Sequence, residues 1–179
     1  MINDVIGNTI KIEEPKILNI DSKKLIGMQT KTSLSNSKAG KIWSQFMPRL
    51  NEVKNNIGSD LFSIQVYPNN FKKEDFTLDT IYTTWAAIEV TDSKTIPNGM
   101  ESQTIEGGLY AVFNHKGATN NIDETFEFIF NKWIPNSDYE VDNRKHFEIL
   151  GEKYFGPNDP NSEEEIWMPI KEKQNVAYE

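Results

Sequence analysis

Apolar and polar residues alternate in six short segments of the chain, a pattern typical of β-strands with one face in a core. These predicted strands span residues 25–34, 61–69, 81–90, 107–117, 146–150 and 163–171. Two other stretches carry apolar residues at helical spacing instead. The first begins near Ser37, with Ile42, Phe46 and Leu50 every fourth residue, and the second holds Ile122, Phe126, Ile129, Phe130 and Trp133.

Three prolines modify these elements. Proline has no N–H group and its ring clashes with the preceding helical turn. Pro48 therefore predicts a bend or a change of bonding in the first helix, and Pro135 predicts the end of the second. Pro169 lies inside the last strand, which predicts an edge strand or a bulge.

The elements run strand, helix, strand, strand, and then repeat in the same order. This predicts an α+β fold with an antiparallel sheet, two main helices and an internal duplication over residues 21–95 and 104–173. Neither half buries enough apolar surface alone, so we expect one domain, 21–179, after an amino-terminal extension, 1–20. The halves should meet on a pseudo-twofold axis and leave a central cleft, a common place for a ligand.

Composition narrows the classes of function. The chain has 179 residues, 37% hydrophobic residues, no cysteine and a formal net charge of -8. The absence of cysteine excludes disulfides and thiolate chemistry. No basic block is present to meet phosphates, so direct binding of nucleic acid is disfavoured. No apolar run is long enough for a membrane helix and no signal peptide is visible, which predicts a cytoplasmic protein without membrane contact.

Signals for metals and cofactors are weak. The two histidines, His115 and His146, lack a partner at metal-ligand spacing, and the glycines of "EGGLY" precede a strand rather than a helix. The acid-rich "PNDPNSEEE" reads as a solvated loop. We therefore expect neither a metal nor a cofactor.

One carboxylate is out of place in the predicted strand "HFEIL". Phe147 and Ile149 share one face, which leaves Glu148 on the other face with Leu150. A carboxylate in an apolar site loses several kcal/mol of hydration unless it is paired, protonated or reached by water. The pattern alone favours an exposed acid, because glutamate is rarely buried; the alternative is an acid that meets a cationic ligand.

Two tryptophans lie on strand faces that do not carry the main apolar row. Trp85 alternates onto the face opposite Tyr82 and Ala86, where it could stack on a flat ligand or pack against a helix. Trp167 lies on the face opposite the apolar side of its strand, which makes it a candidate for the cleft.

The carboxy-terminal half resembles a known family. "YAVFNHKG" (110–117), a helix, and "FEILGEKYFGPNDPNSEEEIWMPIK" (147–171) are similar to the GyrI-like small-molecule-binding family, the effector-binding domain of AraC-type and MerR-type multidrug regulators. "LIGMQTKTS", "IWSQFMPRL" and "AAIEV" match its first half. The likeness covers about residues 15–172 and implies a duplicated strand-helix-strand-strand fold with a cleft for lipophilic, often cationic, compounds.

The resemblance also implies site residues. The acid that faces the ligand in this family corresponds to Glu148, and an aromatic residue of the last strand corresponds to Trp167. Leu150 departs from the pattern, because many members have tyrosine there. Tyr110 reaches the cleft by family analogy only. Glu89 resembles a recurring acid, although a solvated strand end is the slightly preferred interpretation.

The first hypothesis is a stand-alone binding protein, monomeric or weakly dimeric, because the roughly 20 residues before the resemblance are too few for a DNA-binding module. Its ligand would be a lipophilic cation, with Glu148 as counter-charge and apolar contacts from Trp85, Trp167, Tyr110 and Leu150. An alternative is a hydrolase of reactive electrophiles in the same cleft, assisted by Tyr110 or Tyr154. Another is a protein-interaction inhibitor of the gyrase type, with a protein partner.

Overall fold

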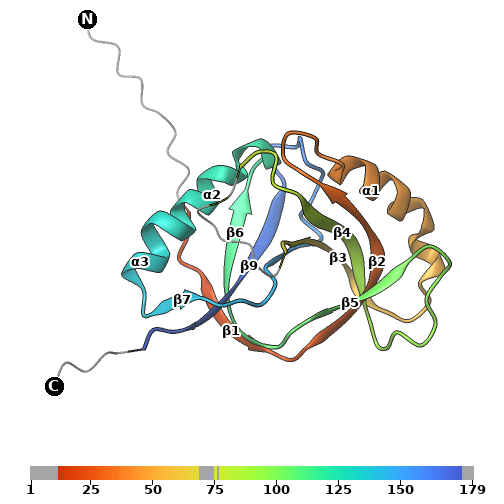
Figure 1. Cartoon of the computed structure of the whole chain (residues 1–179), viewed down its shortest axis with the longest axis horizontal. Helices are drawn as coiled ribbons and strands as arrows, with labels where there is room; N and C mark the ends of the chain where they lie inside the picture. Colours follow the sequence, from red (N-terminus) through yellow and green to blue (C-terminus); the bar gives the residue numbers. More distant parts are fainter. Residues whose placement is uncertain (1–11, 69–74, 76, 175–179) are drawn as a thin grey trace, which may run out of the picture.

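A single antiparallel sheet of nine strands curls into a half-barrel through residues 12–68, 75 and 77–174, the part of the chain that the computed structural model describes (Figure 1). Its main path runs β1-β6-β9-β8-β3-β4-β2-β5, and β7 pairs with β9. The strands are β1 (Lys16–Ile20), β2 (Lys23–Thr32), β3 (Asn56–Val66), β4 (Tyr82–Val90), β5 (Glu101–Ile105), β6 (Gly108–Lys116), β7 (Tyr139–Val141), β8 (Phe147–Leu150) and β9 (Glu163–Glu172).

The strand order is symmetric, as an internal duplication requires. Reading from either end gives the same series when β1 is matched with β5, β2 with β6, β3 with β8 and β4 with β9. The two halves join through β3 and β8, the middle strands of the path. The predicted α+β fold, with duplicated units in one antiparallel sheet and two main helices, is therefore confirmed.

The first strand of each half crosses over to the other half. β1 pairs with β6, and β5 pairs with β2, so the connections β1–β2 and β5–β6 pass each other at the base of the sheet. Gly107 lies at this crossing, and a Cβ atom there would stand 2.7 Å from the carbonyl oxygen of Ile20. The missing side chain lets the two connections touch.

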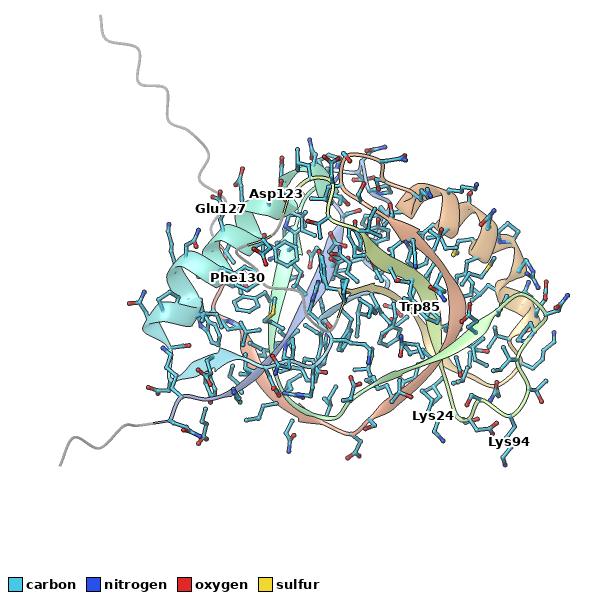
Figure 2. All side chains as sticks on the ribbon, in the orientation of Figure 1. Lys24, Trp85, Lys94, Asp123, Glu127 and Phe130 are labelled. Carbon is cyan, nitrogen blue, oxygen red and sulfur yellow. The ribbon has the colours of Figure 1, made fainter. Side chains whose placement is uncertain are left out.

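Each half carries one helical segment on the convex face. α1 (Ala39–Phe46) and the 3-10 turn η1 (Met47–Glu52) cover β2 and β4, with Ile42 and Phe46 buried. The second segment covers β6 and β9 and comprises η3 (Thr119–Asn121), α2 (Ile122–Phe128), the π-helical turn η4 (Ile129–Trp133) and α3 (Ile134–Asn136). Figure 2 shows Phe130 pointing from this segment toward the sheet, whereas Asp123 and Glu127 point away from it.

The prolines act largely as expected. Pro48 lies in the first turn of η1, where the α-helical bonding gives way to 3-10 bonding. Pro135 lies in the last helical turn, which ends one residue later at Asn136. The expected edge position of Pro169 is wrong, because β9 lies inside the sheet between β6 and β8. Pro169 occupies the gap where the neighbour of β9 changes from β8 to β7, and its carbonyl accepts from the Asp142 N–H, so no ladder bond needs its nitrogen.

Three short strands, β1, β5 and β7, were not predicted from the sequence. They are three to five residues long and mostly exposed, so they lack the alternation that marks the other six. Residues 1–11 of the predicted extension lie outside the described residues. No helix within the described ranges is long and apolar enough to cross a membrane.

Candidate functional site

Glu148 lies where the two halves of the sheet meet. Its neighbours in register are Ser63 on β3 and Ile166 on β9. Ile166 packs under the second helical segment, and α1 covers the other half, so Glu148 points to the convex, helix-bearing face between the two helical segments. Only 8% of the residue is exposed, which excludes the solvated acid that the pattern alone favoured.

Burial controls the charge of this carboxylate. It raises the pKa of Glu148 to about 7, and the hydrogen bond donated by the Ser63 hydroxyl opposes the shift. No ion pair to Glu148 exists among the described residues. At neutral pH the group is therefore shared between its charged and protonated forms, and a cation would fix the charged form.

Aromatic rings cover one end of this position. The ring of Tyr67, which follows β3, lies 5.2 Å from that of Tyr82 and 6.5 Å from that of His146, centre to centre. His146 in turn meets Phe126 of α2 edge-on at 6.3 Å. The rings thus form a continuous row from β4 to α2. Desolvation lowers the pKa of His146 to about 4, so its ring is uncharged at physiological pH.

Polar groups lie at the other end. Glu164 on β9 shares the face of Ile166 by alternation and is 5% exposed. Burial, and then the charge of Glu148, raise the pKa of Glu164 to about 8. Burial also raises the pKa of Tyr154, and the charges of Glu164 and Glu148 raise it further. We refer to Ser63, Tyr67, Tyr82, His146, Glu148, Tyr154 and Glu164 as the Glu148 cluster.

The five predicted site residues divide between the two faces of the sheet. Glu148 and Leu150 alternate onto the convex face. The other three, Trp85, Tyr110 and Trp167, lie together in the apolar core of the concave face. Figure 2 shows Trp85 inside the curve of the sheet. The structure thus brings Glu148 together with Leu150 but separates it from the three aromatic residues by the thickness of one sheet.

The three concave-face residues are packed in the core, and two of them are hydrogen-bonded. Tyr110 is fully buried, and its hydroxyl donates to the carbonyl of Glu106 at 2.9 Å. The Trp167 indole N–H donates to Glu165 at 2.9 Å, and its ring stacks on Phe147 at 5.3 Å. Phe147 precedes Glu148, so these rings support β8 from beneath. A direct role of Trp85, Tyr110 and Trp167 in ligand binding stays a prediction.

Sequence reasoning missed most members of the Glu148 cluster. Alternation alone could have placed Glu164 with Ile166, and Ser63 opposite Phe62 and Ile64, but it does not show which strands are neighbours. His146 and Tyr67 lie at strand ends, where alternation fades. Glu89, the other acid that the resemblance singles out, lies on the Trp85 face and pairs with Lys23 at 2.9 Å.

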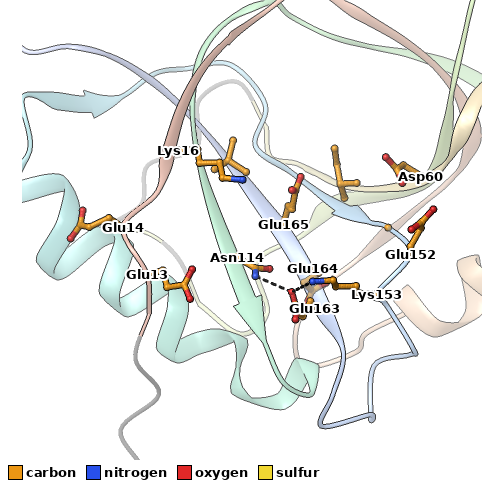
Figure 3. A pocket seen from close by; sticks show the side chains of 13 residues that line it. Glu13, Glu14, Lys16, Asp60, Asn114, Glu152, Lys153, Glu163, Glu164 and Glu165 are labelled. Atoms are coloured by element: carbon orange, nitrogen blue, oxygen red, sulfur yellow. Dashed lines mark hydrogen bonds and ion pairs between the residues drawn. The ribbon is translucent and has the colours of Figure 1, made fainter.

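A second candidate is a pocket of about 450 Å³ at the rim of the concave face (Figure 3). Val112 and Ile149 form its apolar part, and seven acids and two lysines surround them. Glu163 accepts a hydrogen bond there from the Asn114 amide at 3.1 Å and forms an ion pair with Lys153 at 3.5 Å. Glu164 also borders this pocket, but alternation turns its side chain toward Glu148. The other six acids of the rim are partly or fully open to water, which weakens their hold on a cation.

Comparisons with known proteins agree with this architecture. The model of the GyrI-like small molecule binding domain matches residues 13–171. The transcriptional regulator BrlR of Pseudomonas aeruginosa is 26% identical over 156 residues, which cover 87% of this chain and 54% of BrlR. The chain thus spans about half the length of this relative.

Two solved structures share the fold at low identity. SAV2435, solved with bound tetraphenylphosphonium, is 18% identical with a TM-score of 0.59, covering 89% of this chain and 94% of SAV2435. The carboxy-terminal domain of EcmrR is 12% identical with a TM-score of 0.65, covering 92% of this chain and all of that domain (100%).

Proposed function

We propose that this chain, which belongs to the GyrI-like small molecule binding domain family, binds lipophilic cations at the Glu148 cluster. Its role would be that of an effector-binding domain, which captures a drug-like cation and either sequesters it or signals its presence to a partner. Leu150 would add apolar contact beside Glu148. Trp85, Tyr110 and Trp167 would hold β8 in place from the concave face.

The observation that carries this proposal is a buried acid that no described lysine or arginine pairs with. Glu148 is 8% exposed and accepts a hydrogen bond from Ser63, and its neighbours among the described residues include the aromatic rings of Tyr67 and Tyr82. Such a site favours a ligand that brings positive charge together with apolar surface. SAV2435, which has this fold, is known with tetraphenylphosphonium bound, a cation of that kind.

Binding would require the covering rings to move. Tyr67 and Tyr82 lie against each other, and Tyr67 lies against His146, so a ligand that reaches Glu148 replaces some of these ring contacts with its own. Exchange of one aromatic contact for another costs little apolar burial. The free energy of binding would then come mainly from the charge and from the added ring surface.

Calorimetric titration with tetraphenylphosphonium tests the proposal. Triphenylphosphine oxide serves as a neutral ligand of similar shape. We expect Glu148→Gln to weaken binding of the cation by about tenfold or more, from a charge contact of ~1.5–3 kcal/mol, and to change binding of the oxide much less. Equal weakening of both ligands would contradict the charge argument.

Glu165→Gln is the matched control, because Glu165 lies on β9 one residue from Glu164 but faces the concave pocket. It should leave the affinity for tetraphenylphosphonium within about twofold. Loss of affinity in Glu165→Gln, with Glu148→Gln unaffected, would move the site to the concave pocket. No binding by the native chain would refute the proposed function.

A second function, hydrolysis of reactive electrophiles, is favoured by one observation. Tyr154 lies near the two acids with raised pKa values, whereas the other candidate, Tyr110, lies on the far face of the sheet. A carboxyl group that is part protonated at neutral pH can act as a general acid or base. Turnover of a strained epoxide or cyclopropane that is lost in both Glu148→Gln and Tyr154→Phe, with folding intact, would support this function; turnover unchanged in both would exclude it.

A further inference from the structure

Glu164 is a second carboxylate within the same cluster. Glu148 is in register with Ile166, and Glu164 precedes Ile166 by two residues on the same face of β9. The two acids are therefore diagonal neighbours on an antiparallel ladder, where Cα atoms are about 7–8 Å apart and long side chains come into reach. Both are buried, with 8% and 5% of their surface exposed.

Among the described residues, the groups that face the two acids carry no positive charge. Tyr67 and Tyr82 approach Glu148 from β3 and β4, and Tyr154 approaches both acids from the β8–β9 connection. On β6, His115 is in register with Glu164. No ion pair to either acid occurs in the part of the chain that the structure describes.

His115 is already committed to other partners. Its Nε2 donates to the carbonyl of Ala118 at 3.3 Å, and its Nδ1 is hydrogen-bonded to the Thr125 hydroxyl at 2.9 Å. A carbonyl can only accept, so Nε2 carries a proton, and both ring nitrogens are occupied. The histidine thus offers no free N–H to a carboxylate of the pair.

Two buried acids without a cation cannot both be charged at low cost, because each charge disfavours the other. Burial raises the pKa of Glu148 to about 7, and burial with the neighbouring charge raises that of Glu164 to about 8. Without a ligand the pair therefore holds at least one proton near neutral pH. A bound cation would stabilise the charged forms, and the protons would leave to solvent.

We propose that Glu148 and Glu164 bind the cationic ligand as a pair and release protons when it enters, so that this chain captures lipophilic cations more tightly as the pH rises. The inference rests on the proposed function and deepens it. Glu164 becomes a second ligand-binding residue, and the ambient pH becomes a control on capture and release.

Titration of tetraphenylphosphonium into the full chain at pH 7, in buffers with different enthalpies of ionisation, counts the released protons. We expect roughly one proton per bound cation and, by linkage, about tenfold or greater tightening between pH 6 and pH 8. Glu164→Gln should release less than half as many protons. Glu165→Gln, on the other face, should match the native chain.

Each outcome of these measurements supports or overturns either the acid pair or the proposed function. Binding with the same proton release in the native chain and Glu164→Gln, or with no release, would overturn the pairing and leave the proposed function standing. The pair is also measured without ligand, by the pH titration of the ¹³C-labelled glutamate carboxyl signals. Two carboxyl groups that titrate near neutral pH, one lost in each variant, support it; titration of both below about pH 5.5 overturns it. If the native chain does not bind tetraphenylphosphonium although both carboxyl groups titrate near neutral pH, the proposed function is refuted instead.

Discussion

The guanidinium of Arg144 lies over the ring of Tyr110, with its central carbon 4.7 Å from the ring centre. Its N–H groups also donate to the carbonyls of Gly107, Leu109 and Ile170 at 2.8–3.0 Å and to Asp142 at 2.7 Å. One side chain thus ties the segment before β8 to β6 and to β9. The position of Glu148, four residues later, depends on this anchor.

Replacement of Arg144 should therefore be costly. In Arg144→Ala the three carbonyls lose their donor and Asp142 loses its partner, so we expect a loss of about 2–4 kcal/mol in the free energy of unfolding. Urea denaturation measures it. Lys171→Ala is the control, because Lys171 forms an exposed pair with Glu140 at 3.1 Å and such pairs contribute at most about 1 kcal/mol. Similar, small losses in both variants would contradict the anchoring role.

Close strand contact makes one glycine irreplaceable. A Cβ atom on Gly27 of β2 would stand 2.2 Å from the backbone oxygen of Ala86 and 2.6 Å from the Cβ of Ala87 on β4. Backbone atoms inside a paired sheet cannot withdraw, so we expect Gly27→Ala to lose about 2 kcal/mol or more.

Gly40 in α1 provides the opposite case, because a Cβ there meets no atom within 4 Å. Gly40→Ala should gain roughly 0.5–1 kcal/mol from helix propensity. Thermal or urea unfolding of the two variants side by side tests the register of β2 on β4. Equal effects of the two substitutions would show that the strands do not pack as described.

Stability should fall as the medium becomes alkaline. Glu148 and Glu164 have folded-state pKa values of about 7 and about 8, above the ordinary 4.5. They bind protons more tightly in the folded chain, so their contribution is complete below pH 4.5 and is lost as the pH rises through 7 and 8. Glu148→Gln should shrink the fall in unfolding free energy between pH 5 and pH 8.5 by about 1–3 kcal/mol.

The control for this measurement is Glu165→Gln, which should keep the native fall. His146 changes the free energy of unfolding in the opposite direction. Its pKa is lowered to about 4, so its stabilising contribution is lost as the pH falls toward that value. It is present in all three proteins, so it cancels in the comparison. A pH profile of Glu148→Gln that overlays the native profile would show that Glu148 is not buried as an acid.

Local patterns could predict the strands and helices but not the contacts between them. Alternation places Glu148 and Leu150 on one face and Trp167 on the face opposite Ile166, as the structure does. It cannot tell which faces of β4 and β9 turn to the same side as Glu148. That depends on the register of β3 on β8 and of β8 on β9, which pairs residues more than eighty positions apart in the first case. Trp167 was therefore placed with Glu148 by resemblance, and Trp85 only because it lies off the main apolar row of its strand.

The two faces of the sheet make opposite predictions for aromatic substitutions. If the cation binds at the Glu148 cluster, Tyr67→Leu should weaken tetraphenylphosphonium by roughly 3- to 30-fold, since a cation–π contact contributes ~0.5–2 kcal/mol.

Trp167→Phe changes a ring on the concave face and should alter the affinity by less than about threefold while lowering stability. Trp85→Phe should behave in the same way, because Trp85 belongs to the same core. Calorimetric titration of the three variants, each checked for folding by circular dichroism, separates the two effects. Strong loss of affinity in both tryptophan variants, with Tyr67→Leu unchanged, would place the ligand on the concave face and make Trp85 and Trp167 direct contacts. The reverse pattern would assign the cation to the convex face, where Glu148 has aromatic neighbours and pairs with no lysine or arginine of the described ranges.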